Sequence, residues 1–276
     1  MKILHCSPVF SVPWYDCGWF FIKAFMQLGH HITIWDYRLD LFPQTDEYDL
    51  AFVYKGNRDT LTLLPHGPKI CYYPDDMSRE PGIEHVLSGY KHVLTTVRPT
   101  PKNQEWFPTG YDPDLHKPLS TEKNINSIFV GTHTLYKAQF LNVIRPDCIF
   151  GNGWTEGMNT PVKNFPAIYL HEYVRALSLA RVAVNMHRDF LGLNSRLFEM
   201  CACTFTLTDI VPGVEEVLGK ELCSKVGFST PEEGREKVEY YLARPQEREE
   251  LWQAERKAIL PYTYLECAKR VIACAS

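Results

Sequence analysis

The segment from Val182 to Asp209 carries the residues of this chain that are best suited to bind a phosphorylated ligand. Asn194 and Ser195 are good N-cap residues and precede an apolar run with helical spacing. The start of a helix offers unpaired N–H groups and the positive end of the helix dipole, which favour a diphosphate. Arg196 adds a forked cationic donor, and Glu199, on the same helical face, can accept hydrogen bonds from sugar hydroxyls. The segment therefore predicts a nucleotide-binding edge.

A solvated surface helix is the alternative for this segment. A capped helix with an arginine and a glutamate three residues apart usually faces water and holds a weak ion pair. Two residues near the end of the preceding strand, predicted over Val182–Met186, favour a ligand instead. Asn185 and His187 could orient hydroxyl groups or a diphosphate there, although a lone histidine is more often structural.

A glycine turn follows another predicted strand, Ile128–Val130. Gly131 and Thr132 can let backbone amides approach a phosphate, and Lys137 supplies a positive charge from the following helix. A packing glycine and a surface lysine explain these residues about as well on local grounds. The turn is kept as a binding candidate because ligands of open α/β sheets settle beyond the carboxyl ends of the strands.

The stretch Gly151–Trp154 reads GNGW and follows the strand predicted over Cys148–Phe150. Its glycines allow close backbone approach, and the indole of Trp154 could lie against a nucleobase. A buried structural tryptophan is the more common case. Both interpretations of Trp154 stay open.

Several motifs occur in an order that one family shares. After Val182 the chain contains N-x-H-R, G-x-N-S-R-x-F-E, an Ala-Cys pair and L-T-D, and it closes with P-x-E-R-E-E and T-Y-x-x-x-A-K-R. With Ser127–Leu141 and Gly151–Trp154, this order resembles the C-terminal module of the spore-maturation CgeB-like glycosyltransferases, a branch of the GT-B sugar-nucleotide transferases. Order and spacing together are more specific than a single motif. The resemblance runs from Asn126 to the C-terminus, a little over half of the chain.

The resemblance implies an α/β protein of the GT-B fold, with two Rossmann-like domains facing a central cleft. It implies an enzyme, a hexosyl- or pentosyltransferase that moves a sugar from a nucleotide-diphosphate sugar (UDP-, GDP- or another) to an acceptor hydroxyl. No permanent cofactor and no metal are expected, because GT-B enzymes generally stabilise the leaving diphosphate with helix ends and cations. Glu199 matches the glutamate that holds the ribose hydroxyls. The expected donor-binding residues are Gly131, Thr132, Lys137, Trp154, Asn185, His187, Asn194, Ser195, Arg196 and Glu199.

Three positions depart from the family's pattern. Gly192 stands where related retaining transferases often carry a glutamate, Thr204 replaces a common glycine, and Lys137 stands where arginine is common. A lysine can pair with phosphate as a point charge but lacks the bidentate fork. Because the glutamate is missing at Gly192, the retaining mechanism does not carry over, and both anomeric outcomes stay open.

The acceptor side is expected in the N-terminal half, where the resemblance extends to architecture only. The loop Ser7–Gly18 holds Trp14, Tyr15 and Asp16, and in GT-B proteins this loop faces the cleft. Asp16 could take the acceptor proton if the reaction inverts, because a carboxylate shielded by aromatic rings can have raised basicity. A helix cap is the favoured alternative for Asp16.

A second pair of carboxylates lies at another strand end. Asp75 and Asp76 follow the strand predicted over Lys69–Tyr73. Adjacent carboxylates suggest a metal, but the intervening residue and the further ligands of a DxD site are missing. We therefore expect acceptor contact or turn formation here, and no bound metal.

Short apolar strands alternate with helices along the chain, as in parallel sheets buried on both faces. The alternation begins at Lys2, breaks at the proline-rich stretch Trp106–Pro118 and restarts at Ile125. This pattern predicts an N-terminal Rossmann-like acceptor-side domain at residues 1–118 and a nucleotide-sugar-binding domain at 119–260. The last helix, residues 261–276, is expected to pack back on the N-terminal domain, as in GT-B relatives.

The composition fits such a protein. A chain of 276 residues with 45% hydrophobic residues can build two modest cores, and nine cysteines without C-x-x-C or zinc-ligand spacing are expected to be reduced, buried thiols. Neither a secretion signal nor an apolar segment near the ~20 residues of a membrane span is evident, so a soluble, cytoplasmic protein is expected. The net charge of −4 gives no general footprint for nucleic acid, although a local basic patch is compatible with it.

A small molecule, a glycan, a protein and a modified DNA base are all compatible acceptors, and the oligomeric state is open. One alternative function is transfer to a hydroxymethylated base in viral DNA, for which Trp14, Tyr15 and the stretch Lys102–Trp106 offer aromatic and cationic residues. The sequence is also compatible with a GT-B-fold sugar-nucleotide epimerase or hydrolase, and with a non-catalytic nucleotide-sugar-binding module.

Overall fold

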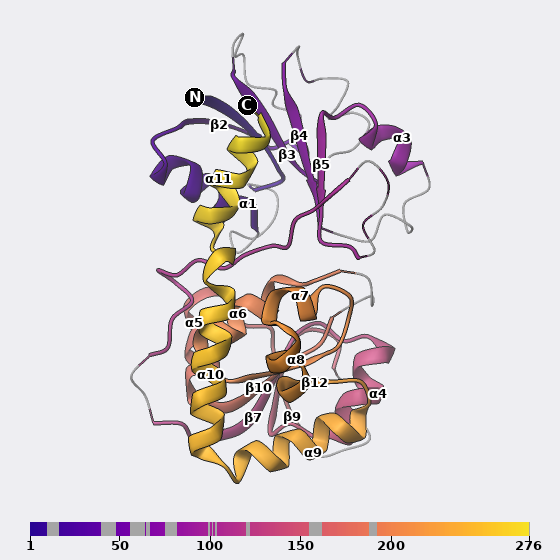
Figure 1. The fold of residues 1–276 in the computed structure, drawn as a ribbon, viewed down its shortest axis with the longest axis vertical. Coiled ribbons are helices and arrows are strands. Elements are labelled where there is room, and N and C mark those ends of the chain that lie inside the picture. Colours follow the sequence, from indigo (N-terminus) through magenta and orange to yellow (C-terminus); the bar gives the residue numbers. More distant parts are fainter. Residues whose placement is uncertain are drawn as a thin grey trace. The chain divides into compact units, whose positions relative to one another are not determined.

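The chain divides into two α/β units, Met1–Gly110 with Tyr262–Ser276, and Tyr111–Pro261 (Figure 1). The computed structural model describes residues 1–9, 17–39, 48–55, 64, 67–74, 82–98, 100, 102, 104–119, 122–154, 162–187 and 192–275. Within these residues each unit holds one sheet of six strands, and every strand pair is parallel. The expected α/β class with two Rossmann-like sheets is confirmed.

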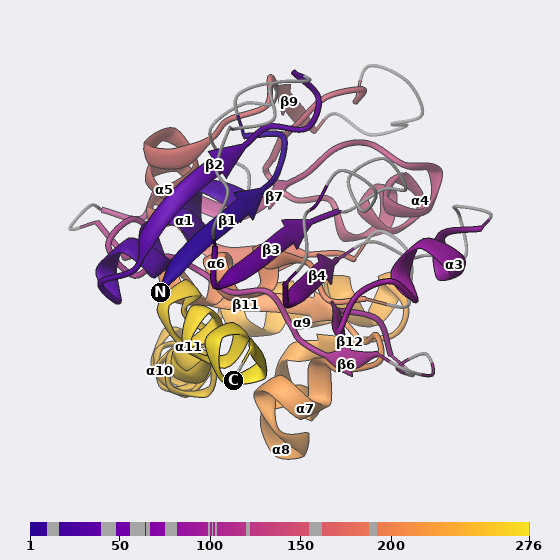
Figure 2. The same cartoon turned by 90° about the horizontal axis from the view of Figure 1, so that it is seen from above.

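The first unit has the sheet order β2-β1-β3-β4-β5-β6, of which Figure 2 shows β2, β1, β3 and β4 in sequence from above. Its strands are β1 (Lys2–Cys6), β2 (His31–Trp35), β3 (Leu50–Tyr54), β4 (Lys69–Tyr73), β5 (His92–Thr95) and β6 (Glu105–Trp106). Its helices are α1 (Cys17–Gln27), α3 (Ile83–Leu87) and α11 (Tyr264–Ala275). All five residues of β3 are buried, as expected for a parallel strand covered on both faces.

The two faces of this first sheet carry separate apolar cores. On one face Ile3 packs with Phe21 and Phe52, and on the other Leu4 packs with Trp35. Because side chains alternate along a strand, neighbouring residues of β1 supply opposite cores. The run of apolar residues in β1 is therefore explained by burial on both sides.

The last helix, α11, packs beside α1 in the first unit. The ring of Tyr264 stacks on Phe20 with centroids 5.0 Å apart and meets Phe21 edge-on at 5.3 Å. The chain passes very close to itself here, since a Cβ on Gly110 would lie 2.4 Å from the carbonyl oxygen of Tyr262. The first unit ends at Gly110, earlier than the boundary at residue 118 that the prolines predict.

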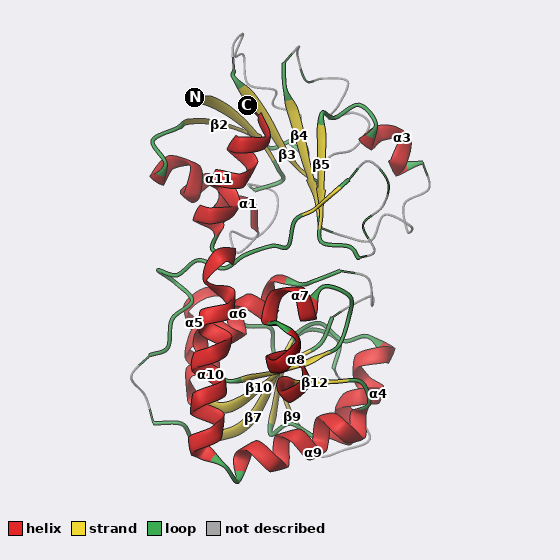
Figure 3. Ribbon diagram, viewed as in Figure 1, coloured by secondary structure: helices red, strands yellow, loops and turns green. Residues whose placement is uncertain are grey.

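The second unit has the sheet order β12-β11-β10-β7-β8-β9, with helices around it (Figure 3). Its strands are β7 (Ile125–Val130), β8 (Cys148–Phe150), β9 (Lys163–Phe165), β10 (Ala180–Asn185), β11 (Thr206–Asp209) and β12 (Gly227–Phe228). Its helices are α4 (Leu135–Ile144), α5 (Leu170–Leu179), α6 (Ser195–Cys203), α7 (Val214–Leu218), α8 (Lys220–Val226), α9 (Pro231–Leu242) and α10 (Pro245–Ile259), and the 3₁₀ turn η2 (Leu260–Tyr262) follows. Among the helices of the described residues, none has the length and apolar character that a membrane crossing requires.

Candidate functional site

The carboxyl ends of β7 and β10 lie next to each other, because these strands pair in parallel with Phe129 opposite Val184. The strand order changes direction at this pair, which makes it a topological switch point. Strands β8 and β9 extend the sheet on the side of β7, whereas β11 and β12 extend it on the side of β10. Ligands of open α/β sheets bind beyond the carboxyl ends of the strands at such a switch point. The residues predicted to bind a donor all lie at or after the ends of β7, β8 and β10.

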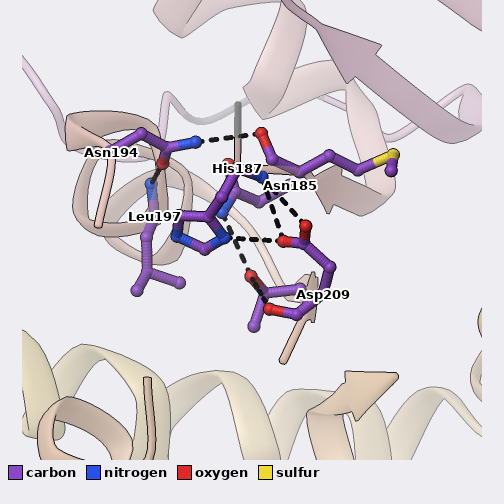
Figure 4. A network of polar contacts seen from close by, with 7 residues as sticks. Asn185, His187, Asn194, Leu197 and Asp209 are labelled. Carbon is purple, nitrogen blue, oxygen red and sulfur yellow. Dashed lines mark hydrogen bonds and ion pairs between the residues drawn. The ribbon is translucent and has the colours of Figure 1, made fainter. Parts of the chain in front are cut away.

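The helix α6 begins shortly after β10 and is capped as its sequence predicts. Oδ1 of Asn194 accepts the backbone N–H of Leu197 at 3.0 Å, and Nδ2 of Asn194 donates to the Met186 carbonyl at 3.0 Å (Figure 4). The Asn194 side chain therefore ties the helix start to the chain just after β10. Because this cap satisfies one of the four unpaired N–H groups of a helix start, the remaining groups and the dipole still favour an anion.

Arg196 and Glu199 are partly exposed on α6 and lie near the buried Tyr173 of α5. Burial, and after it the Glu199 carboxylate, raise the pKa of the Tyr173 hydroxyl, whereas the Arg196 guanidinium lowers it. In the described part of the chain Arg196 and Glu199 make no ion pair with each other. The arrangement differs from a surface helix with an internal ion pair.

His187 lies immediately beyond β10 and is completely buried against Asp209, the last residue of β11. The two carboxylate oxygens of Asp209 accept the His187 backbone N–H at 3.0 and 3.1 Å, and Oδ1 lies 2.6 Å from Nδ1 of the ring (Figure 4). Burial and a hydrogen bond to Asp209 raise the pKa of Tyr136 on α4. Asp209 therefore joins β10, β11 and α4, while Nε2 of His187 has no hydrogen-bond partner in the structure as described.

Asn185, the last residue of β10, is also completely buried. Its Nδ2 donates to Oγ1 of Thr208 at 3.1 Å, and Oγ1 of Thr208 donates to the Asp209 carbonyl at 3.3 Å. Oδ1 of Asn185 has no partner among the described residues. Two polar atoms at or just beyond the end of β10, Asn185 Oδ1 and His187 Nε2, are thus buried without a hydrogen bond to any described residue.

The turn after β7 is tightly packed around Gly131. A Cβ on Gly151 would lie 2.0 Å from the Gly131 carbonyl oxygen, so glycine is required at position 151. Lys137 is only 5% exposed, and its Nζ lies 3.4 Å from the carbonyl oxygen of Thr132. Lys137 is therefore a buried cation held at the Gly131–Thr132 turn, and not a surface lysine.

Trp154 is buried and bonded to the same turn. Its Nε1 donates to the Gly131 carbonyl at 2.7 Å, and its ring meets Phe129 and His133 edge-on at 5.6 and 4.9 Å. The side chain is 2% exposed. These contacts are those of a structural tryptophan, in which the indole holds the turns after β7 and β8 together.

The predicted acceptor-side residues fall outside the described part of the chain. They are Trp14, Tyr15, Asp16, Asp75 and Asp76. Their roles stay predictions from the sequence.

Three residues of the site were missed by sequence reasoning, namely Asp209, Thr208 and Tyr136. The L-T-D motif that ends at Asp209 belongs to the family's pattern, but the motif alone assigns it no role. The available signal was positional: parallel pairing of two consecutive strands brings polar residues at their carboxyl ends to one edge.

One trio among the described residues could hold a metal ion. Nδ1 of His92, a carboxylate oxygen of Glu105 and Sγ of Cys274 all lie within 4.8 Å of one another. His92 and Glu105 begin β5 and β6, so the trio is at the amino edge of the first sheet and belongs to a different unit from the residues around α6.

The chain belongs to the glycosyl transferase-like family, whose sequence model matches residues 135–273. It is a glycosyltransferase of the GT-B fold. The comparison with curated protein sequences finds no match.

Solved structures match the fold over the full chain. The DNA-modifying enzyme β-glucosyltransferase, solved with and without uridine diphosphoglucose, has a TM-score of 0.69 at 15% identity and covers 100% of this chain and 99% of its own. The T4 phage enzyme in complex with UDP and Mn²⁺ gives 0.67 at 13% identity and 100% of both chains. An α-glucosyltransferase bound to UDP and a 13-mer DNA gives 0.64 at 11% identity, with 99% and 98% covered.

Proposed function

We propose that this glycosyltransferase binds a nucleotide-diphosphate sugar at the carboxyl edge of the second sheet and transfers its sugar to an acceptor hydroxyl. The single observation that carries the proposal is the Asn194-capped start of α6, the helix that follows β10 and carries Arg196 and Glu199 in its first turns. The pyrophosphate would meet the helix N–H groups and Arg196, and the ribose hydroxyls would meet Glu199. UDP is the first nucleotide to test, because structural neighbours bind UDP or its glucose ester.

Negative charge develops on the diphosphate as the sugar leaves. Preorganised donors and cations stabilise such charge without reorganising during the reaction. The start of α6 and Arg196 provide this on the β10 side, and the buried Lys137 ammonium provides it at the turn after β7. These groups would stabilise the departing diphosphate without a metal ion.

We propose further that the chain is of the CgeB-like type, that it works without a metal ion and that it acts in the cytoplasm. The motif order after Val182 supports the subtype. The nine cysteines, all within the described residues, form no disulfide, which is typical of a reducing compartment. Unchanged turnover after dialysis against a chelator would support the metal-free mechanism, and activity restored only by added Mn²⁺ would contradict it.

The donor proposal is tested by a thermal-shift screen of UDP, GDP, ADP, CDP and dTDP and their sugar esters. A ligand that binds only the folded protein stabilises it by mass action, by about 2.7 kcal/mol at a hundredfold excess over Kd. The melting temperature rises as a result. We expect one base to stabilise the wild type and to lose its effect in Arg196→Ala. Absence of any stabilisation, with the start of α6 vacant in soaked crystals, would contradict the donor site.

A modified DNA base is the second candidate for the acceptor. It is favoured by the full-length fold match to enzymes that modify or bind DNA. The test is incubation with a labelled nucleotide sugar and duplexes that contain either hydroxymethylated or unmodified bases. Label in the hydroxymethylated duplex alone would support this acceptor, and absence of label from both duplexes would contradict it.

A further inference from the structure

The orientation of the Asn185 amide is fixed by its neighbours. Oγ1 of Thr208 gives its proton to the Asp209 carbonyl, so the same oxygen can only accept from Asn185. The amide group that faces Thr208 is therefore the NH₂ group, and the atom without a partner is the carbonyl oxygen Oδ1. Within the described structure Asn185 presents a buried, unused hydrogen-bond acceptor.

The proton of the His187 ring is fixed by the same network. Asp209 accepts the His187 backbone N–H and a hydrogen bond from Tyr136, which marks its carboxylate as an acceptor. The 2.6 Å contact with Nδ1 then requires the ring proton on Nδ1. In the neutral form of this ring the lone pair of Nε2 is a second buried acceptor, unused by the described residues.

Both acceptors lie beside the start of α6. Asn185 and His187 flank Met186, and the Met186 carbonyl is bonded to the Asn194 cap (Figure 4). In a nucleotide sugar the transferred sugar is attached directly to the second phosphate. A diphosphate at the start of α6 therefore brings the sugar close to the end of β10.

A buried acceptor without a hydrogen bond is destabilising, and in native proteins such atoms are few and usually have a reason. An ionised diphosphate offers only acceptor oxygens, so it cannot satisfy Oδ1 of Asn185 or the lone pair of Nε2. A sugar offers several O–H donors. We propose that Asn185 Oδ1 and His187 Nε2 accept hydroxyl groups of the transferred sugar, and that Asp209 is the positioning residue that aims His187. This inference rests on the proposed donor site.

The test compares two ligands that differ only in the sugar, UDP and UDP-glucose, by calorimetry; if the thermal-shift screen selects another base, its diphosphate and glucose ester replace them. His187→Asn keeps an N–H donor near Asp209 and removes Nε2, and Asn185→Leu keeps the branched shape and removes the amide. We expect each variant to bind UDP as the wild type does, within about twofold, and UDP-glucose about tenfold more weakly, the effect of one lost hydrogen bond. His187→Gln, whose amide oxygen can replace Nε2, should restore part of the loss.

A measurement on the wild type alone covers the case in which a variant does not fold. Deoxy analogues of UDP-glucose, each lacking one hydroxyl, should include at least one that binds about tenfold more weakly than UDP-glucose while UDP affinity stays the same. Equal losses of UDP and UDP-glucose in the variants, or unchanged UDP-glucose binding, would overturn the inference and leave the donor site standing. A wild type that binds neither ligand class would instead contradict the proposed function itself.

Discussion

Asp209 holds His187 by both its main chain and its ring. One carboxylate group accepts the backbone N–H at 3.0 and 3.1 Å and contacts Nδ1 at 2.6 Å, although the residues are 22 positions apart. The contact exists because β10 and β11 pair in parallel, with Asn185 opposite Thr208 at their carboxyl ends. Asp209 therefore fixes the orientation of a buried imidazole at the predicted site.

Replacement of Asp209 should lower stability and change the position of the His187 ring proton. Asp209→Ala leaves two buried N–H groups of His187 without an acceptor, and we expect a loss of about 2–5 kcal/mol in the free energy of unfolding. Tyr136→Phe is the matched control, because it removes a neighbour of Asp209 and keeps the His187 contacts. Long-range ¹H–¹⁵N spectra of the ring should report a proton on Nδ1 in wild type and Tyr136→Phe. The same spectrum in Asp209→Ala would contradict the positioning role.

Glu199→Ala should weaken binding of the nucleoside diphosphate about tenfold or more, because charged hydrogen bonds to hydroxyls are stronger than neutral ones. The fold should be little affected, since Glu199 is partly exposed and makes no ion pair in the described structure. Glu249→Ala, an exposed glutamate of α10, is the control with unchanged affinity. Calorimetry that gives the wild-type affinity for Glu199→Ala would remove Glu199 from the site.

Local signals explain why the start of α6 could be predicted from the sequence. The Asn194 side chain caps the helix by bonding the backbone N–H of Leu197, three positions along the chain. Such a local contact can be predicted from the sequence. The pairing of Asp209 with His187 depends on strand order, which no local pattern contains. The burial of Lys137 could not be predicted either, because lysines are almost always exposed. In this structure its Nζ contacts the Thr132 carbonyl.

Trp154→Phe should destabilise the second unit. The change removes the 2.7 Å bond to the Gly131 carbonyl and leaves that buried oxygen unsatisfied, which costs about 1–3 kcal/mol. Denaturant unfolding measures the loss. Because a phenyl ring can still stack on a nucleobase, Trp154→Phe should bind diphosphates as the wild type does. Unchanged stability of the variant would contradict the structural role of Trp154.

His5 should make the protein less stable in acid. Burial lowers the pKa of His5 from 6.5 to about 3, and neither ring nitrogen has a partner among the described residues. Between these two values the unfolded chain binds a proton that the folded chain does not, so the free energy of unfolding falls as the pH falls, by about 1.4 kcal/mol per unit from this group. His5→Leu should flatten the stability profile between pH 6.5 and 3. An identical profile in the variant would contradict the buried neutral ring.

Glu255 on α10 should act in the opposite direction. Burial raises the pKa of this carboxyl well above its usual range, and the hydrogen bond from the Thr206 backbone N–H, at 3.0 Å, only partly opposes the shift. The folded protein therefore keeps a proton that the unfolded chain loses above about pH 4.5, and the contribution of Glu255 to stability falls as the pH rises. Glu255→Gln keeps an acceptor for Thr206 without a charge to bury, so the variant should gain stability over wild type at pH 8 and show a smaller gain at pH 5. Glu255→Ala, which removes the acceptor, should be less stable than wild type at both pH values. A Glu255→Gln protein whose difference from wild type is the same at pH 5 and pH 8 would show that the carboxyl is ionised in the folded state.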